Sequence, residues 1–265
     1  MKPSSLPSLL AVFAHPDDEA LVAGGVLAQH AAAGARTAVV TATWAPDTGR
    51  AAELTHALRV LGAGKPRMLG YADLRVPDSA PGRPRLCDVP REQVVERLVA
   101  HIRAVRPQVI VTHDAFGSGH PDHVRTHEVV LEAARTAGIA GLHSHADRPW
   151  QPSAVYGATH PCSESGALDG LLATVGKRLH TVQNDMAHAA VDIRPWLDRK
   201  IAAILDRKIA AIMAHSSETA RERSLPGLLA RLPGPERDAI VAMEFFTRLD
   251  AGYLPGPDRL EFLTV

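Results

Sequence analysis

The chain has 265 residues, of which 46% are hydrophobic and 22% charged, as in an ordinary globular protein. Its 29 basic residues balance its 29 acidic residues, so net charge gives no reason to expect nucleic acid or a stable membrane association. Cys87 and Cys162 form neither a CxxC pair nor a disulfide framework, and no run approaches the roughly 18 apolar residues of a membrane span, so we expect a cytoplasmic protein.

In the first half of the chain, short apolar runs alternate with segments of helical periodicity. The apolar runs that predict buried strands cover 9–14, 37–43, 66–71 and 108–114. The helical patterns that follow them cover 18–33, 49–62, 91–105 and 121–136. This alternation is typical of βαβ units. It predicts an α/β fold with a Rossmann-like, mostly parallel sheet and helices on both faces, in which ligands bind beyond the carboxyl ends of the strands.

No shift in composition marks a domain boundary, so we expect residues 1–265 to form a single domain. Two proline-rich stretches, 73–90 and 141–153, interrupt the alternation, and the first is longer than an ordinary connection. We expect 76–90 and 138–160 to be variable loops that contact the substrate. Residues 191–250 are expected to form a C-terminal helical portion.

The helical portion contains an internal duplication. The sequence LDRKIAAI at 197–204 repeats without change at 205–212. An apolar line with i, i+4 spacing continues across both copies, which predicts that the duplication lengthens an amphipathic helix. We interpret it as a neutral duplication rather than a new contact surface.

Two motifs carry the candidate chemistry. The first apolar run ends in HPDDE at 15–19, and the fourth is followed by HPDH at 120–123, each at the start of a helix. Proline and acidic residues suit a helical first turn, so either motif alone is also a well-formed helix start. Since parallel strands end at one edge of their sheet, the two motifs can converge. Together they supply the three N/O ligands of a hydrolytic zinc site and a spare carboxylate.

Local spacing does not decide which of these side chains bind metal. His123 and His127 have the i, i+4 spacing of metalloprotease helices, but the glutamate of HExxH is missing. Gly24 and Gly25 do not complete a GxGxxG pattern, so no dinucleotide site is expected.

The motifs AHPDDE and GHPDH resemble those of the PIG-L/LmbE-type zinc-dependent de-N-acetylases. GRAAELTHALRVLG, LGYAD and DRKIAAIMAHSSE extend the similarity, which is greatest to the actinobacterial mycothiol-pathway branch and to antibiotic-glycoside deacetylases. The resemblance covers roughly 5–75, 108–130 and 190–218. It implies an LmbE-like fold and hydrolysis of the N-acetyl group of an N-acetylglucosaminyl-type amino sugar in a small glycoconjugate. That conjugate would be a thiol-cofactor precursor or an antibiotic or natural-product intermediate.

The same resemblance implies roles for individual residues. His15, Asp18 and His123 correspond to the metal ligands, with Zn²⁺ as the cofactor and Fe²⁺ as the alternative for two histidines and one aspartate. Asp17 corresponds to the general base. His120 corresponds to a protonated residue that stabilises the oxyanion and protonates the leaving amine. The alternative activity is that of an amidase, which would cleave a larger acyl group or a cysteine-conjugate amide.

Residues around the ligands are also implied by the resemblance. Asp122 would orient a ligand histidine, and Glu19 would support the metal ligands without binding the metal. Arg50 and Asp73 match positions that hold the sugar. The chain departs from the mycothiol branch at Ser118, where that branch has a tyrosine. The expected partner is a small amino-sugar glycoconjugate, while the sequence leaves open whether the protein forms a homo-oligomer.

Overall fold

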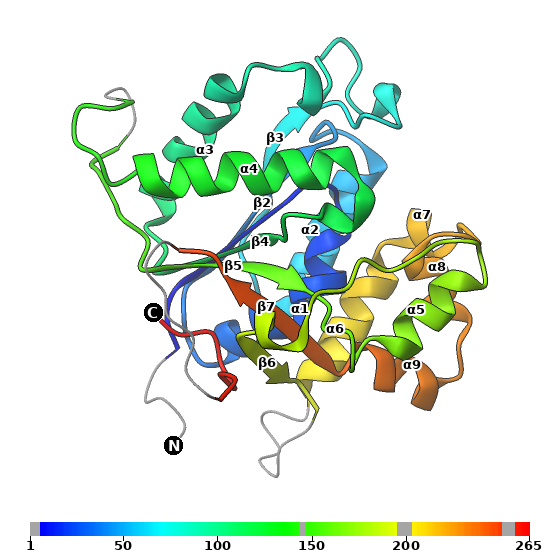
Figure 1. Ribbon diagram of the computed structural model, residues 1–265. Coiled ribbons are helices and arrows are strands. Elements are labelled where there is room, and N and C mark those ends of the chain that lie inside the picture. The colour runs from blue at the N-terminus through cyan, green and yellow to red at the C-terminus, as the bar shows by residue number, and fades with distance from the viewer. Residues whose placement is uncertain (1–5, 144–146, 195–202, 251–257) are drawn as a thin grey trace.

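The sheet lies at the centre of the molecule, between two layers of helices (Figure 1). The structure is a computed structural model that describes residues 6–143, 147–194, 203–250 and 258–265. The described residues form a seven-stranded sheet in the order β3-β2-β1-β4-β5-β7-β6. Strands β3, β2, β1, β4 and β5 are parallel, whereas β7 runs antiparallel between β5 and β6. The predicted α/β fold with a mostly parallel sheet is therefore confirmed.

The parallel strands coincide with apolar runs because both of their faces are covered by helices. In β1, Leu10 and Val12 pack on one side of the sheet, and Ala11 and Phe13 pack on the other. The strands span Leu9–Phe13 (β1), Thr37–Thr43 (β2), Arg67–Tyr71 (β3), Val109–His113 (β4), Ala154–Thr159 (β5), Ala189–Asp192 (β6) and Met243–Arg248 (β7).

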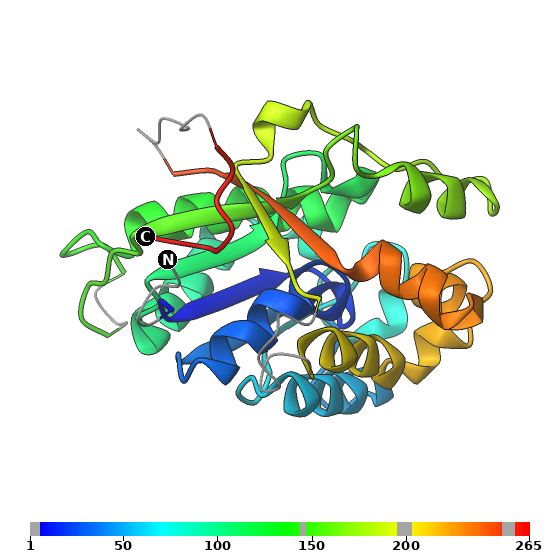
Figure 2. The ribbon, with the colours of Figure 1, turned by 90° about the horizontal axis from the view of Figure 1, so that it is seen from below.

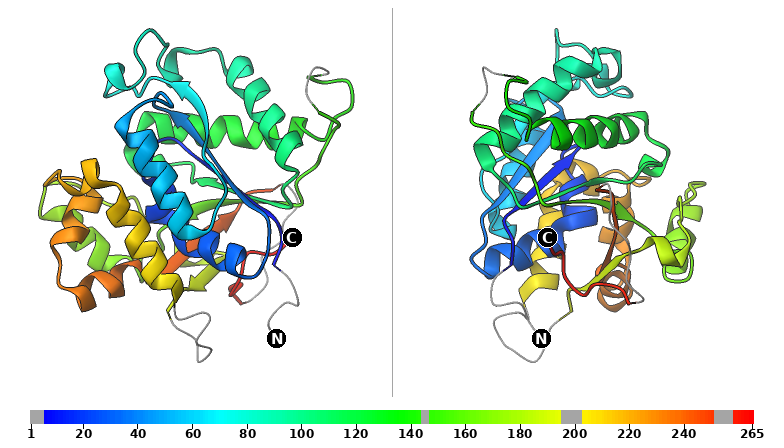
Figure 3. Two further views of the ribbon diagram at one scale, coloured as in Figure 1. Left: turned by 180° about the vertical axis from the view of Figure 1, so that it is seen from behind. Right: turned by 60° about the vertical axis from the view of Figure 1, so that its left-hand side comes forward.

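Helices cover both faces of the sheet. Helices α1, α2 and α6 pack on one face, and α3 and α4 pack on the other (Figure 2). Seen from behind, α6 lies beside α2 (Figure 3). The α-helices span Asp18–Ala32 (α1), Gly49–Leu61 (α2), Arg91–Val105 (α3), Pro121–Thr136 (α4), Gly166–Ala173 (α5), Ala203–Ala214 (α6), Ser216–Thr219 (α7), Leu225–Arg231 (α8) and Gly234–Val241 (α9). Short 3-10 turns span Pro77–Ser79 (η1), Leu86–Asp88 (η2), Gly117–Gly119 (η3) and Asn184–Met186 (η4). No helix among the described residues has the length and apolar character needed to cross a membrane.

A buried ion pair joins helices α1 and α6 to strand β7. Lys208 of α6 lies 2.8 Å from Glu244 of β7, and both side chains are almost fully buried. Glu244 also accepts hydrogen bonds from the backbone N–H groups of Gly25 and Val26 in α1, at 2.7 and 2.8 Å. Gly25 is required here, because a Cβ at this position would lie 2.5 Å from the side chain of Ile193.

The second half of the chain differs from the sequence interpretation in two respects. Part of the stretch 138–160, which was expected to be a loop, forms strand β5. The expected helical portion 191–250 contains α6 to α9 but also strand β7. β5 directly follows a proline-rich stretch, and β7 pairs antiparallel with distant segments outside the regular strand–helix alternation, so periodicity alone did not reveal them. The second copy of the duplication lies in α6, whereas nearly all of the first copy falls outside the described residues.

Candidate metal centre

The first motif forms a tight turn between β1 and α1. Asp17 lies immediately before α1 and has φ 127° and ψ −28°, a conformation that residues other than glycine rarely adopt. Such backbone strain costs on the order of 1–3 kcal/mol and is commonly found at functional sites. The N–H of Asp17 donates to Oε2 of Glu19 at 3.0 Å, and its carboxylate pairs with Arg50 at 2.9 Å. The turn therefore directs Asp17 to Arg50, whereas Asp18 faces the histidines.

The predicted ligands His15, Asp18 and His123 lie together at the carboxyl edge of the sheet. His15 Nδ1 is 3.0 Å from His123 Nε2 and 3.4 Å from Asp18 Oδ2. The other carboxylate oxygen of Asp18, Oδ1, is 3.5 Å from His123 Nε2. Ligands bound tetrahedrally to zinc at about 2.0–2.1 Å are about 3.3 Å apart, and each of these three separations is close to that value, with the two histidines facing different oxygens of Asp18. The donor set therefore fits a divalent metal.

Further histidines and aspartates surround these donors. Ligand atoms within 4.8 Å of one another form three overlapping groups among the described residues. The groups are His15, His120 and His123; His15, Asp73, His120 and Asp122; and Asp18, His113 and His123. The predicted trio is divided between the first and third groups, which share His123. The sequence thus located the cluster, but several combinations of its members could hold a metal.

His113 is a member of the cluster that the sequence analysis missed. Its Nε2 lies 3.4 Å from Asp18 Oδ2 but also accepts the backbone N–H of Ala14 at 3.1 Å, so this lone pair is already used. The ring stacks on that of His123, with centroids 3.8 Å apart. His127 forms a hydrogen bond through Nδ1 to the carbonyl of His113 at 2.8 Å and belongs to none of the three groups. The position of His113 at the end of an apolar run was the available signal.

The second motif supports the histidine of the first. His15 Nε2 lies 3.3 Å from Asp122 and 3.2 Å from Asp73, so its N–H has carboxylate acceptors behind the donor cluster. The same Asp122 oxygen accepts the N–H of Leu74 at 2.9 Å, and the other accepts the thiol of Cys87 at 3.1 Å. Burial opposes protonation of His15, but its bonds to Asp122 and Asp18 raise its pKa to about 10. Such partners fix the orientation of a ligand imidazole.

Arg50, which was expected to hold a sugar, contacts residues of the site itself. Its buried guanidinium lies 2.9 Å from Asp17 and 2.8 Å from Glu218, and it packs over the ring of Trp44 at 4.6 Å. Burial raises the pKa of Asp17 to about 7, against the opposing effect of the Arg50 charge. Arg50 therefore positions Asp17 in the structure, and its contact with a sugar stays a prediction.

Glu19 and His215 form a buried pair behind the turn. Their side chains are fully buried, and His215 Nε2 lies 2.9 Å from Glu19 Oε1. Burial lowers the pKa of His215, but the charge and hydrogen bond of Glu19 outweigh this effect and raise it. Since the other oxygen of Glu19 accepts the N–H of Asp17, the pair supports the strained turn.

His120 caps the N-terminus of α4. Its Nδ1 accepts the backbone N–H of Asp122 at 3.2 Å, so a neutral His120 carries its proton on Nε2. Burial lowers the pKa of His120 to about 4, and the charges of His15 and Arg75 contribute. This direction opposes the expected protonated state. The contribution of His15 requires a charged ring, however, and a metal-binding histidine is neutral.

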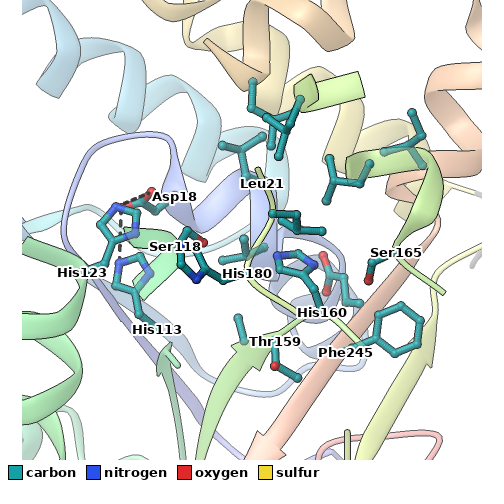
Figure 4. Close-up of a pocket in the computed structure, with 18 of the residues that line it drawn as sticks. Asp18, Leu21, His113, Ser118, His123, Thr159, His160, Ser165, His180 and Phe245 are labelled. Carbon is teal, nitrogen blue, oxygen red and sulfur yellow. Dashed lines mark ion pairs between the residues drawn. The ribbon is translucent and has the colours of Figure 1, made fainter. Parts of the chain in front are cut away.

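A pocket of about 560 Å³ opens beside the donor atoms. Asp18, His113 and His123 lie on one side of it, and His160 and Phe245 lie on the other (Figure 4). The sequence analysis placed substrate contacts in 76–90 and 138–160. The pocket is lined by part of the second stretch, but also by residues of 164–180 and 225–245, which carried no motif.

A Rossmann-like sheet that gathers two HPD motifs at one edge is the arrangement expected of an LmbE-like protein. The chain belongs to this family: residues 10–134 match the family model described as PIG-L, GlcNAc-PI de-N-acetylase.

Curated relatives and a solved structure extend this match. A 1D-myo-inositol 2-acetamido-2-deoxy-alpha-D-glucopyranoside deacetylase from Mycobacterium leprae is 39% identical over 66% of this chain and 67% of its own. The enzyme of the same name from Rhodococcus jostii is 33% identical over 74% of this chain and 79% of its own. In structure, the chain is similar to N,N'-diacetylchitobiose deacetylase from Pyrococcus horikoshii, with a TM-score of 0.61 and 17% identity over 92% of this chain and 84% of the other. At that identity the likeness shows a shared fold.

Proposed function

We propose that this protein hydrolyses the N-acetyl group of an N-acetylglucosaminyl-type amino sugar in a small glycoconjugate. Acetate and a free amine would be the products. The observation that carries the proposal is the convergence of His15, Asp18 and His123 donor atoms at distances of 3.0–3.5 Å. Asp17, the residue before Asp18, has its carboxylate held by Arg50. The similarity to curated deacetylases of an acetamido-glucopyranoside supports the substrate class.

We assign the metal to His15, Asp18 and His123 and propose zinc. A zinc ion held there would polarise the amide carbonyl and promote ionisation of the attacking water. Two histidines and one aspartate also suit ferrous iron, which metal analysis of the purified protein distinguishes.

Asp17 is the proposed general base. Its carboxylate belongs to none of the metal-capable groups and is held by Arg50, so it is available to accept a proton from the attacking water. The Glu19 bond to the N–H of Asp17 holds the strained turn, and Arg50 holds the carboxylate. The water oxygen would enter acetate as the C–N bond breaks, and the protons of that water would end on the amine.

His120 is the proposed contact for the amide oxygen. Because Nδ1 accepts a backbone N–H, Nε2–H of the neutral ring is the available donor, and His120 lines the pocket. A donor aimed at an oxygen that gains negative charge stabilises the transition state. This assignment requires no protonated imidazole.

Acetate release tests the proposal. The purified, metal-loaded protein would be incubated with methyl N-acetylglucosaminide, with the acetamido-glucosyl inositol named for the relatives, and with acyl-cysteine conjugates. We expect acetate from the acetylated sugars and none after metal removal with a chelator. Cleavage of the acyl-cysteine amides without acetate release from any sugar would refute the proposal and favour the amidase.

A further inference from the structure

The pocket beside the metal centre continues into a chamber with apolar walls. Figure 4 shows the donor residues at one end of the pocket and Ser165 and Phe245 at the other. Helices α1, α5, α8 and α9 each contribute a half-buried apolar side chain to its lining. These side chains are Leu21, Leu168, Leu225 and Ile240. Their exposed apolar surface faces the pocket, so a ligand that covers it gains hydrophobic stabilisation.

Several polar groups in the walls of the chamber are paired within the protein, whereas the buried hydroxyl of Thr159, which also lines the pocket, has no partner. Lys208 and Glu244 form their ion pair at 2.8 Å, and the hydroxyl of Ser165 donates to the carbonyl of Pro161 at 2.7 Å. His160 also lines the pocket, and burial lowers its pKa, so it adds no charge at neutral pH. A sugar placed deep in this chamber would lose the hydration of several hydroxyl groups, and the Thr159 hydroxyl and the His160 ring offer fewer partners than those hydroxyl groups need. An apolar group has no hydrogen bonds to water to lose when it enters the chamber.

The size of the pocket indicates which part of a substrate reaches the chamber. Its volume of about 560 Å³ is typical of sites that enclose a drug-sized molecule, far more than a two-carbon acetyl group occupies. His180 and Leu21 lie between the donor residues and the Phe245 end (Figure 4). With the acetamide at the metal donors, a substituent of the sugar ring has to extend past His180 to reach the Phe245 end.

We propose that the chamber binds an apolar group, a hydrocarbon chain or an aromatic ring, carried by the aglycone of the amino-sugar substrate. This inference rests on the proposed function, because cleavage of acetyl leaves the chamber to the aglycone. A long N-acyl chain is the competing occupant of the same surface and is an outcome of the test.

Alkyl glycosides test the chamber directly. Methyl and hexyl N-acetylglucosaminides would be compared for acetate release and, independently, for binding by calorimetry. Burial of one methylene contributes roughly a fourfold gain in affinity, so we expect the hexyl compound to have at least a tenfold lower KM and Kd. Equal values for the two glycosides would overturn the proposal. A gain from N-hexanoyl in place of N-acetyl on the methyl glycoside, without a gain from the hexyl aglycone, would overturn it in favour of an acyl pocket.

Two variants of helix α5 distinguish a direct contact with the aglycone from a general effect on the fold. Leu168 lines the pocket, whereas Leu171, also half-buried in α5, packs against the core and does not line it. We expect Leu168→Gln to raise the KM and Kd of the hexyl glycoside at least fivefold and to leave those of the methyl glycoside within twofold. Leu171→Gln should leave the hexyl preference intact. Equal effects of Leu168→Gln on both glycosides would refute the proposal. If no acetate is released from any sugar, the proposed function fails. The calorimetric Kd values of the two glycosides then still show whether the chamber binds an apolar aglycone.

Discussion

Replacement of Asp17 by asparagine separates proton transfer from metal binding. The side chain keeps its shape, and asparagine is among the residues that best tolerate a positive φ, here 127°. Arg50 keeps Glu218 and the carbonyl of Pro16 as partners, so its buried charge is not left alone. We therefore expect a folded Asp17→Asn protein with a Tm within a few degrees of the wild type.

The expected loss of activity is large, because an amide cannot accept the proton. A positioned general base contributes about 10²–10⁴-fold to a rate, so kcat should fall by that factor. Metal content should not change, since Asp17 is in none of the metal-capable groups. The combination of retained metal and lost turnover distinguishes a base from a ligand.

The assay is acetate release at saturating substrate, together with metal analysis of the same preparation. Asp114→Asn is the matched control, because Asp114 is similarly buried, and its Oδ1 accepts N–H groups of Phe116 and Gly117 at 3.1 and 2.8 Å. An amide oxygen can accept both bonds, so kcat of the control should stay within about threefold. If Asp17→Asn retained more than about a tenth of wild-type kcat, Asp17 would not be the base.

Three further changes test the metal site and the fold. His123→Ala removes one of three donors, and we expect metal content to fall well below one equivalent with loss of acetate release; full occupancy would exclude His123 as a ligand. Lys208→Met leaves a buried carboxylate without its cation, which should cost about 3–5 kcal/mol and lower Tm by roughly 10 °C in a melting curve; an unchanged Tm would contradict this account. Gly25→Ala places a Cβ 2.5 Å from Ile193 and should destabilise by about 1–3 kcal/mol in denaturant unfolding. Gly49→Ala meets nothing within 4 Å and should be neutral or slightly stabilising, so equal effects of the two substitutions would refute the packing argument.

The sequence specified the parallel strands β1 to β4 because that information is local. Apolar runs mark strands buried on both faces, and helical periodicity marks the helices between them, as in β1 to α4. The antiparallel strands β6 and β7 depend on pairing between distant segments, which leaves only a weak local pattern. The same limit explains why β5 was included in a predicted loop.

The two HPD motifs determined where the candidate site lies, since strands that run parallel present their carboxyl ends at one edge. Only the tertiary structure placed Asp122 of the second motif behind His15 of the first, and turned Arg50 to Asp17. It also brought His113 against Asp18 and built the apolar chamber from α1, α5, α8 and α9. Short motifs predict the reactive residues, because one turn can hold both a metal ligand and a base. No motif predicts the walls of the pocket, because the walls are formed by helices that come together only in the folded chain.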